Sequence, residues 1–463
     1  MSGNDSKSQP QVARAVVDYF RCPEEYARFG LAGELRARAG FFRFGLDLLC
    51  YGQTSADEWA ATAEEGVHDL SGLSRIKGKT CYLPFDPSAI ITNLREERYV
   101  SRQNGSSVMR KVARPLYYSI RPFLGVGLRK HLQRLQLRGW EDKLFPHWPV
   151  DQTADRLLER LLAMSMRAQD VDKVPFVWFW PAGWRACAIM THDVEEAAGR
   201  DFCLSLMDLD EAAGIKSSFQ FVPEKRYPVS SALLGEVRER GFEVNVHDLN
   251  HDGRLYDERE EFLRRAEKIN HYARKYRALG FRSGVLYRNL DWYDAYELSY
   301  DMSVPNVAHL DPQAGGCCTT KPYFIGRILE LPLATTQDYT LFHILSDFTT
   351  ARWEEQMKLI ADSHGLVSFN VHPDYIIEDR ARGVYCELLS KLSRFCSEKS
   401  IWLALPKEVD RWWRERNAME LVESDGGWRV RGAGADRAVV AYASLAGDGS
   451  VAYTVAPQSP VTH

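Results

Sequence analysis

Residues 242–253 read FEVNVHDLNHDG, a short apolar run that ends at His247 and continues into a polar turn carrying His251. Short apolar runs of this kind predict a buried strand. An amphipathic stretch over residues 257–280 follows and predicts a helix on the outside of the sheet. A strand followed directly by a helix is the unit from which parallel α/β folds are built.

The same unit recurs on both sides of this stretch. Further short apolar runs are VPFVWFW (174–180), ACAIMT (186–191), SSFQFV (217–222), LVSFNVH (366–372) and IWLALP (401–406). Their alternation with amphipathic stretches predicts parallel strands with helices outside. The length of residues 171–406 suits a barrel or a barrel-like α/β domain.

Two flanking regions have a different texture. Residues 1–170 are predicted to be mostly helical, because residues 56–70 and 153–169 carry apolar positions at helical spacing. Residues 407–463 predict a helix and then a small antiparallel β appendage with a Gly-Asp-Gly turn at 447–449. We therefore expect three regions, with the barrel in the middle.

The composition is that of an ordinary globular protein. Of the 463 residues, 45% are hydrophobic and 26% are charged, which excludes broad disorder. The net charge of −4 is too small to predict nucleic acid as the partner. Nine scattered cysteines without a CxxC pair predict reduced thiols. The chain has no signal segment and no run of about 18 apolar residues, so we expect a cytoplasmic protein.

Basic residues gather between Arg98 and Arg138, with no acidic residue among them. One interpretation is a face that meets anionic lipid headgroups or a phosphate-bearing carrier. The other, which we weight more, is a solvated helix face paired with acids elsewhere in the fold. Pro115 and Pro122 interrupt the stretch, so a single long amphipathic helix is not expected.

Five ionisable residues fall at, or just beyond, the carboxyl ends of expected strands: Asp193, Glu195, His247, Arg282 and His372. Taken singly, each has a common structural explanation, such as an acid that caps a helix or a histidine satisfied in a loop. Sites in parallel barrels assemble at the carboxyl rim, however. The shared position of the five therefore favours a functional site.

The two histidines predict a metal site. His247 and His251 are four residues apart, a spacing that places two imidazoles on one side of a helical turn. Neutral imidazole is a good ligand for zinc and related divalent ions. Of the two acids after residues 186–191, one can ligate an ion and the other can take a proton from water.

In their order along the chain, these motifs resemble the polysaccharide deacetylases with the NodB homology domain, carbohydrate esterase family 4. The resemblance covers roughly residues 174–406 and rests on THDVE at 191–195, the His-x3-His pair, FRSGVLYRNLDW at 281–292 and the strand that ends in His372. Residues 214–223 resemble the family's second strand, and residues 296–303 resemble its fourth motif. It implies a distorted (β/α)7 barrel. It also implies an N-deacetylase, a hydrolase of linear C–N amide bonds that removes an N-acetyl or other acyl group in glycan or glycoconjugate biosynthesis.

The resemblance further implies a role for each matching residue. It makes Asp193 the catalytic base, Arg282 the residue that tethers this base and His372 the general acid. Asp301 corresponds, less securely, to the acid of the fourth motif.

The implied cofactor is one divalent metal ion, expected to be zinc and held by Glu195, His247 and His251. Here the sequence departs from the usual motif of two adjacent aspartates, since Val194 follows Asp193. Glu195 would take the place of the second acid, as in family members with Asp-x-Asp. Whether Asp193 or Glu195 ligates the metal stays open. Ser283 and Gly284 stand where prolines are usual, a change that concerns the substrate subsite.

The implied partner is an N-acylated sugar or sugar conjugate, which could be nucleotide-linked, lipid-linked or small and soluble. Two other functions stay open. One is a metal-assisted amidohydrolase acting on a small nitrogenous metabolite, and the other is a catalytically silent carbohydrate-binding protein of the same fold. Metal content and acetate release distinguish these possibilities.

Overall fold

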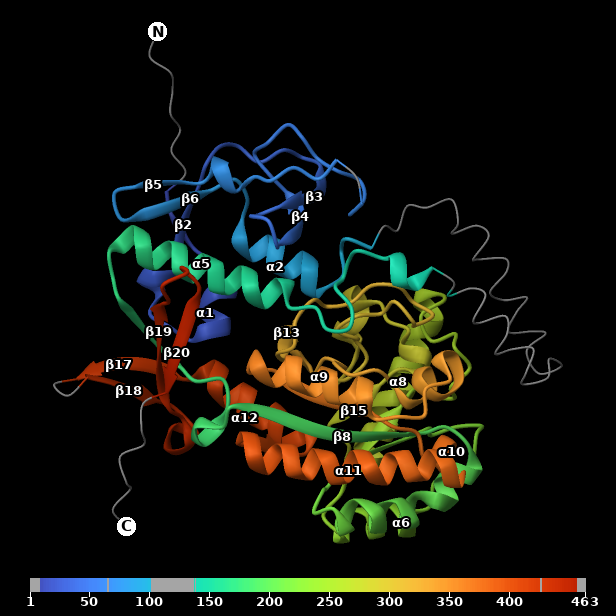
Figure 1. Cartoon of the computed structure of the whole chain (residues 1–463). Helices are drawn as coiled ribbons and strands as arrows, with labels where there is room; N and C mark the ends of the chain where they lie inside the picture. Colours follow the sequence, from blue (N-terminus) through green and yellow to red (C-terminus); the bar gives the residue numbers. More distant parts are fainter. Residues whose placement is uncertain (1–8, 65, 101–136, 138, 425–426, 456–463) are drawn as a thin grey trace.

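The computed structural model describes residues 9–64, 66–100, 137, 139–424 and 427–455. Residues 101–136 and Arg138, which hold most of the basic stretch, lie outside the described residues, so the lipid or phosphate contact proposed for that stretch rests on sequence alone. Figure 1 shows the N-terminal part of the chain above the central sheet and the C-terminal hairpins beside it.

A nine-stranded sheet forms the centre of the molecule, in the order β13-β14-β12-β11-β10-β9-β8-β15, with β16 also paired to β8. Its strands are β8 (Ala186–Val194), β9 (Ser218–Phe221), β10 (Glu243–His247), β11 (Gly280–Arg282), β12 (Tyr300–Asp301), β13 (Tyr323–Ile325), β14 (Ile328–Glu330), β15 (Leu366–Asn370) and β16 (Ile401–Leu403). Every pairing is parallel except that of β13 with β14. The prediction of a mixed α/β domain with parallel strands is confirmed.

The two ends of the curved sheet approach each other. The chain after β14 contacts β15, because the Ala334 amide donates to Ser368 Oγ at 2.8 Å and Thr335 Oγ1 donates to the Ser368 carbonyl at 2.8 Å. The sheet therefore curls into part of a barrel, consistent with a NodB-like arrangement. The count of seven β/α units remains a proposal.

Helices follow the strands and cover the outside of the sheet, and Figure 1 shows α11 next to β8 and α6 farther out. They are α6 (Ala197–Ala212), α7 (Ser231–Glu239), α8 (Arg259–Tyr276), α9 (Ala351–Asp362), α10 (Pro373–Ile376), α11 (Asp379–Lys399) and α12 (Pro406–Ala418). In α8, the residues Phe262, Ala266, Ile269 and Ala273 recur at helical spacing and are buried. The burial of one apolar stripe, with charged residues opposite, fixes each helix against the sheet.

The N-terminal region is not mainly helical in its described part, contrary to prediction. Besides α1 (Arg14–Phe20), α2 (Pro87–Arg95) and α5 (Thr153–Gln169), it contains β1 (Gln11–Val12), β2 (Arg28–Leu31), β3 (Ala39–Arg43), β4 (Leu49–Gln53), β5 (Arg75–Lys77) and β6 (Thr80–Leu83). The helix predicted over residues 153–169 is confirmed as α5. The one expected over residues 56–70 is absent from its described residues; Ala60 instead forms a bridge to Phe41.

The apolar run at 174–180 also has a different partner from the one expected. It forms β7 (Lys173–Val177), which pairs antiparallel with β19 (Val440–Leu445) and not with the barrel strands. β19 pairs in turn with β20 (Val451–Val455), and a second hairpin joins β17 (Glu420–Ser424) to β18 (Gly427–Arg431). The C-terminal residues are thus built into a sheet with the segment that precedes the barrel.

Two smaller expectations concern cysteines and hydrophobic length. All nine cysteines are free and eight of them are buried, as the scattered spacing predicts. Within the described part of the chain, no helix combines the length and the apolar character needed to cross a bilayer.

Candidate active site

Asp193 stands near the end of β8, a strand in which all nine residues are buried. Its Oδ1 accepts a hydrogen bond from Arg282 Nη1 at 3.1 Å, and its Oδ2 accepts one from Asn370 Nδ2 at 2.8 Å. Burial alone would raise the pKa of Asp193, but the charges of Arg282, His247 and His372 outweigh it and lower the pKa to about 2. The carboxylate is therefore ionised and held in one orientation.

Arg282 comes from β11, which is separated from β8 by β10 and β9 in the sheet. The side chain is fully buried, and its Nη1 also donates to Thr191 Oγ1 at 2.8 Å. Its Nε donates to the carbonyl of Met302 at 2.8 Å. These contacts fix the guanidinium at a single position against the Asp193 carboxylate, so that it can hold this carboxylate in place.

Glu195, His247 and His251 form a group whose ligand atoms all lie within 4.8 Å of one another. The Oε1 atom of Glu195 is 3.0 Å from His251 Nε2 and 3.9 Å from His247 Nε2. The two histidines do not share a helical turn. His247 ends β10, and the following loop carries left-handed backbone at Asp248 (φ 53°) and His251 (φ 52°), which turns the second ring toward the first.

The chemistry of this group fits a divalent cation. His247 Nδ1 donates to the Arg282 carbonyl at 3.0 Å, so its lone pair lies at Nε2. The Nε2 atoms of both histidines are buried without a hydrogen-bond partner among the described residues. Burial raises the carboxyl pKa of Glu195, but the histidines outweigh it and hold the pKa well below its usual range. Two imidazole nitrogens and one ionised carboxylate are the donor set of a zinc site with open positions.

Arg226, which no motif marks in the sequence, contacts the His251 ring at Nδ1, on the side away from Glu195. Its Nη2 donates to the His251 carbonyl at 2.9 Å and lies 3.1 Å from His251 Nδ1. These contacts set the orientation of the ring, whose Nε2 lies 3.0 Å from Glu195 Oε1.

Glu195 is placed by an acid from another part of the chain. The carboxylate of Asp374, in α10, accepts from the amides of Glu195 at 3.1 Å, Glu196 at 3.3 Å and Gly199 at 2.8 Å. These amides open α6, where a carboxylate satisfies backbone donors that the helix leaves free. The position of the longer glutamate side chain is thus fixed through its backbone.

His372 lies on the other side of the group. Its Nδ1 is 2.6 Å from Asp338 Oδ1, while its Nε2 is 3.9 Å from Asp193 Oδ2 and 3.6 Å from Glu195 Oε1. Burial lowers the pKa of His372, but the carboxylates, above all Asp338, outweigh it and raise the pKa to about 10. The imidazolium can therefore present a proton at Nε2. Sequence reasoning missed Asp338, because it lies in a loop several residues beyond the end of β14.

Asp301, expected as a further catalytic acid, is not joined to this group by any hydrogen bond of the described residues. It accepts from Tyr293 Oη at 2.8 Å and from Ser303 Oγ at 2.7 Å. Ser303 Oγ in turn accepts from the Ser283 amide at 2.8 Å. Asp301 thus supports the chain after β11, and the carboxylate that contacts His372 belongs to Asp338.

Close packing around residue 284 explains why a glycine stands at this position of the altered arginine motif. A Cβ built at this position would lie 2.4 Å from Asp248 Oδ2 and 2.9 Å from His251 Cδ2. Any larger residue would therefore move the loop that carries His251. The departure from the usual prolines accompanies the close packing of this loop.

No family model and no curated protein sequence matches the chain. Among solved structures, it is similar to a protein from Mycobacterium smegmatis described as a polysaccharide deacetylase, with a TM-score of 0.42 and 13% identity over 54% of this chain and 96% of that one. A protein from Bordetella bronchiseptica described as a polysaccharide deacetylase involved in O-antigen biosynthesis gives a TM-score of 0.29 and 19% identity, over 50% and 84% of the two chains.

PuuE allantoinase gives a TM-score of 0.36 and 14% identity, covering 51% of this chain and 92% of the allantoinase. Polysaccharide and peptidoglycan deacetylases, the proteins whose motifs the sequence resembles, thus stand among the similar structures, together with this allantoinase. At these identities and TM-scores, the functional proposal rests on the geometry of the site and on the motif resemblance of the sequence.

Proposed function

We propose that this chain is a metal-dependent hydrolase of the polysaccharide deacetylase type, which removes an N-acetyl or other acyl group from a substrate containing an amino sugar. One observation carries the proposal. An ionised carboxylate with a pKa of about 2 and an imidazolium with a pKa of about 10 face each other beside a group of three metal-ligand side chains. Base, acid and Lewis-acid site are the three parts that amide hydrolysis needs.

Glu195, His247 and His251 would hold the ion, for which zinc suits the two nitrogen ligands. A divalent ion in this position supplies Lewis acidity, which polarises a carbonyl and makes water a stronger acid. Arg226 and the Arg282 carbonyl orient the two imidazoles. Outer partners of this kind set the ring orientation of ligating histidines.

Asp193 accepts the proton of the attacking water. Its Oδ1 is occupied by Arg282, and the hydrogen bond from Asn370 to Oδ2 limits the carboxylate to one orientation. His372 donates a proton to the departing amine, without which C–N cleavage would release an unstable anion. Asp338 keeps this ring protonated and directs Nε2 toward the site.

The proposal extends to the context of the reaction. An enzyme of this type in the cytoplasm would act in glycan or glycoconjugate biosynthesis, on a nucleotide-linked, lipid-linked or small soluble acetamido sugar. A screen of acetamido sugars for acetate release, with small amides and ureides as the other arm, tests the substrate class. Hydrolysis confined to the second arm would replace the sugar with a small nitrogenous metabolite.

A pair of substitutions tests the mechanism. In His247→Ala, zinc content and acetate release should be lost together. In Asp193→Asn, zinc should remain while turnover falls by about a thousandfold, within the range of lost proton-transfer catalysis. Zinc is measured by mass spectrometry, and His68→Ala, an exposed histidine, is the control.

Two outcomes would change the scheme. Turnover by metal-stripped His247→Ala would eliminate it. Loss of zinc from Asp193→Asn would exchange the roles of Asp193 and Glu195.

A further inference from the structure

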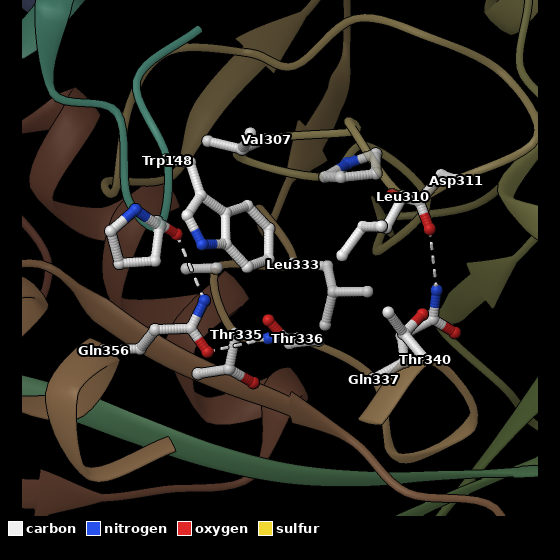
Figure 2. A pocket seen from close by; sticks show the side chains of 13 residues that line it. Trp148, Val307, Leu310, Asp311, Leu333, Thr335, Thr336, Gln337, Thr340 and Gln356 are labelled. Atoms are coloured by element: carbon white, nitrogen blue, oxygen red, sulfur yellow. Dashed lines mark hydrogen bonds between the residues drawn. The ribbon is translucent and has the colours of Figure 1, made fainter. Parts of the chain in front are cut away.

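Two hollows in the described part of the chain differ in the room that they leave for a ligand. Figure 2 shows the one beside Gln337, which Trp148 closes on one side. The Trp148 ring already contacts Trp140 and His309, and about 20 Å³ remains, which is room for about one water molecule. The other hollow lies in the N-terminal region and measures about 240 Å³. Clefts of about 300–1,000 Å³ take drug-sized molecules, so this cavity suits a single ring with its substituents.

The larger cavity forms where the chain folds back over the hairpin of β3 and β4. After β4, residues 54–60 cross to the other edge of β3, where the Phe41 amide donates to the Ala60 carbonyl at 2.8 Å. At the open end of the hairpin, the Arg36 amide donates to the Thr54 carbonyl at 2.8 Å. The loop is thus attached at both of its ends, and the cavity lies between the loop and the hairpin.

Bare backbone lines the cavity on the side of the hairpin. Gly40 and Gly52 are cross-strand partners, and both line the cavity. A Cβ at Gly40 would lie 2.9 Å from the Ala60 carbonyl oxygen and 3.0 Å from the Trp59 ring. Glycine at position 40 therefore allows the loop to close over the hairpin.

Arg38 presents its charge to the cavity in a set orientation. Its guanidinium lies over the Trp59 ring, with Cζ 3.2 Å from the ring centroid. Stacking uses the flat face of a guanidinium and leaves the N–H groups at its edge free. No hydrogen bond or ion pair joins the Arg38 side chain to another of the described residues. Such a free edge recognises a carboxylate or a phosphate through two parallel N–H···O bonds.

The other charged residues of the lining limit the kind of anion that can bind. Arg36 Nη2 is 2.6 Å from Asp57 Oδ1, and Glu58 has no ion-pair partner among the described residues. Two arginines and two acids leave the lining without net charge, so a polyanion such as a nucleic acid is repelled as much as it is attracted. Carboxylates accept hydrogen bonds from hydroxyl groups, and the Thr54 hydroxyl can donate or accept. The lining therefore suits one anionic group on a ring that carries hydroxyl groups.

We propose that this cavity is a binding site for an acidic sugar unit, either a uronate or a sugar phosphate, and that Arg38 binds its anionic group. The site is separate from the metal group. Figure 1 shows β3 and β4 above α2 and α5, with β8 on the far side of these helices. The inference does not depend on the proposed function, and it gives the N-terminal region a ligand of its own.

Calorimetry with the zinc-loaded full chain tests the site, with glucuronate and glucose 1-phosphate as anionic probes and glucose as the neutral probe. At least one anionic probe should bind, and at least tenfold more tightly than glucose. The tighter of the two identifies the anionic group as a carboxylate or a phosphate. Arg38→Gln should weaken its binding at least tenfold, because the charged fork is lost. Arg75→Gln is the control, because Arg75 is an exposed arginine of β5, in a different sheet, and binding should be unchanged.

Glu58→Gln tests the contact with the hydroxyl groups. Binding should weaken severalfold, because an amide oxygen is a poorer acceptor than a carboxylate. If Glu58 only repelled the anion, binding would become tighter, and the proposed hydroxyl-bearing ligand would be wrong. The substituted side chains Arg38, Glu58 and Arg75 are all exposed, so circular dichroism should show an unchanged fold.

The site is overturned if neither anionic probe binds, if glucose binds as tightly as they do, or if Arg38→Gln binds them as tightly as before. Absence of acetate release from acetamido sugars is a separate result. It would refute the proposed function and leave the acidic-sugar site unaffected.

Discussion

His372 and Asp338 show how one contact at the residue scale sets the state of a catalytic group. The ring is buried, which favours the neutral form, yet Asp338 at 2.6 Å contributes most to a pKa of about 10. An imidazolium loses its donor proton as the pH rises through its pKa. The acid form of His372 therefore persists through neutral pH while Asp338 is charged.

Replacing Asp338 with Asn removes this charge and should lower the pKa of His372 toward the ordinary value of about 6.5. The alkaline loss of kcat should then begin at a lower pH, and kcat at pH 8 should fall by roughly ten- to a hundredfold. The pH profile of kcat checks this. Asp301→Asn is the matched control, because Asp301 contacts Tyr293 and Ser303 and not His372. An unshifted alkaline limb in Asp338→Asn would show that Asp338 does not act through His372.

The residues that sequence reasoning selected and those it missed differ in one physical respect. Asp193, His247 and His372 end apolar runs, and the position of a strand end is encoded locally by hydrophobic pattern. Asp338 and Arg226 have no such marker, and Asn370, although it ends β15, shows its role only through its contact with Asp193. Their importance comes from contacts between segments far apart in the chain, which only the folded backbone brings together.

At the scale of elements, the connection between α10 and α6 places Glu195. Asp374 of α10 accepts from three amides at the start of α6, so it positions the segment that carries Glu195. Asp374→Ala should lower the free energy of unfolding by about 1–2 kcal/mol, as the loss of a helix cap does. It should also weaken zinc affinity by about tenfold or more, because the outer support of a ligand is lost.

A second helix cap provides the control for this prediction. Asp86 caps α2 in the N-terminal region by accepting from the amides of Ser88 and Ala89. Asp86→Ala should cost similar stability and leave zinc affinity unchanged, as measured by chemical unfolding and by competition with a zinc chelator. Equal zinc affinity in the two variants would show that the α10–α6 connection does not position the ligand.

The sequence predicts whether a segment is a helix or a strand where the local hydrophobic pattern determines it. It does not predict the pairing where a segment far away in the chain is the partner. The runs that became β8, β9, β10 and β15 are buried on both faces, so they read as apolar throughout. The run at 174–180 has the same appearance but pairs with β19, from the other end of the sequence. The segment 56–70 has helical spacing, yet pairing with β3 through Phe41 overrides it.

At the scale of the whole molecule, the terminal regions and the barrel share apolar packing. One buried cluster includes Phe20 of α1, Leu161 of α5, Ile189 of β8 and Ala441 of β19. The boundaries proposed near residues 170 and 406 therefore mark changes in the sequence pattern, but the hydrophobic core continues from one region into the next. This arrangement explains how the segment before α5 is anchored to the barrel, where Asp151 and Asn306 exchange two hydrogen bonds of 2.8 Å each.

Breaking a buried ion pair between the N-terminal region and the barrel tests whether the two regions unfold together. Glu97 Oε2 accepts from Arg288 Nε at 2.6 Å, and both side chains are less than a tenth exposed. Glu97→Gln would leave the Arg288 charge buried and uncompensated, so the free energy of unfolding should fall by about 3–5 kcal/mol. In the exposed pair of Arg14 with Glu24, Glu24→Gln should cost less than about 1 kcal/mol.

Because the core is shared, the loss in Glu97→Gln should move the whole unfolding transition. Far-ultraviolet circular dichroism and the release of bound zinc should then shift together to lower denaturant concentration. A separate early transition in which the N-terminal region unfolds while zinc stays bound would contradict this. It would show that the barrel is stable by itself and that the ion pair only docks one region on the other.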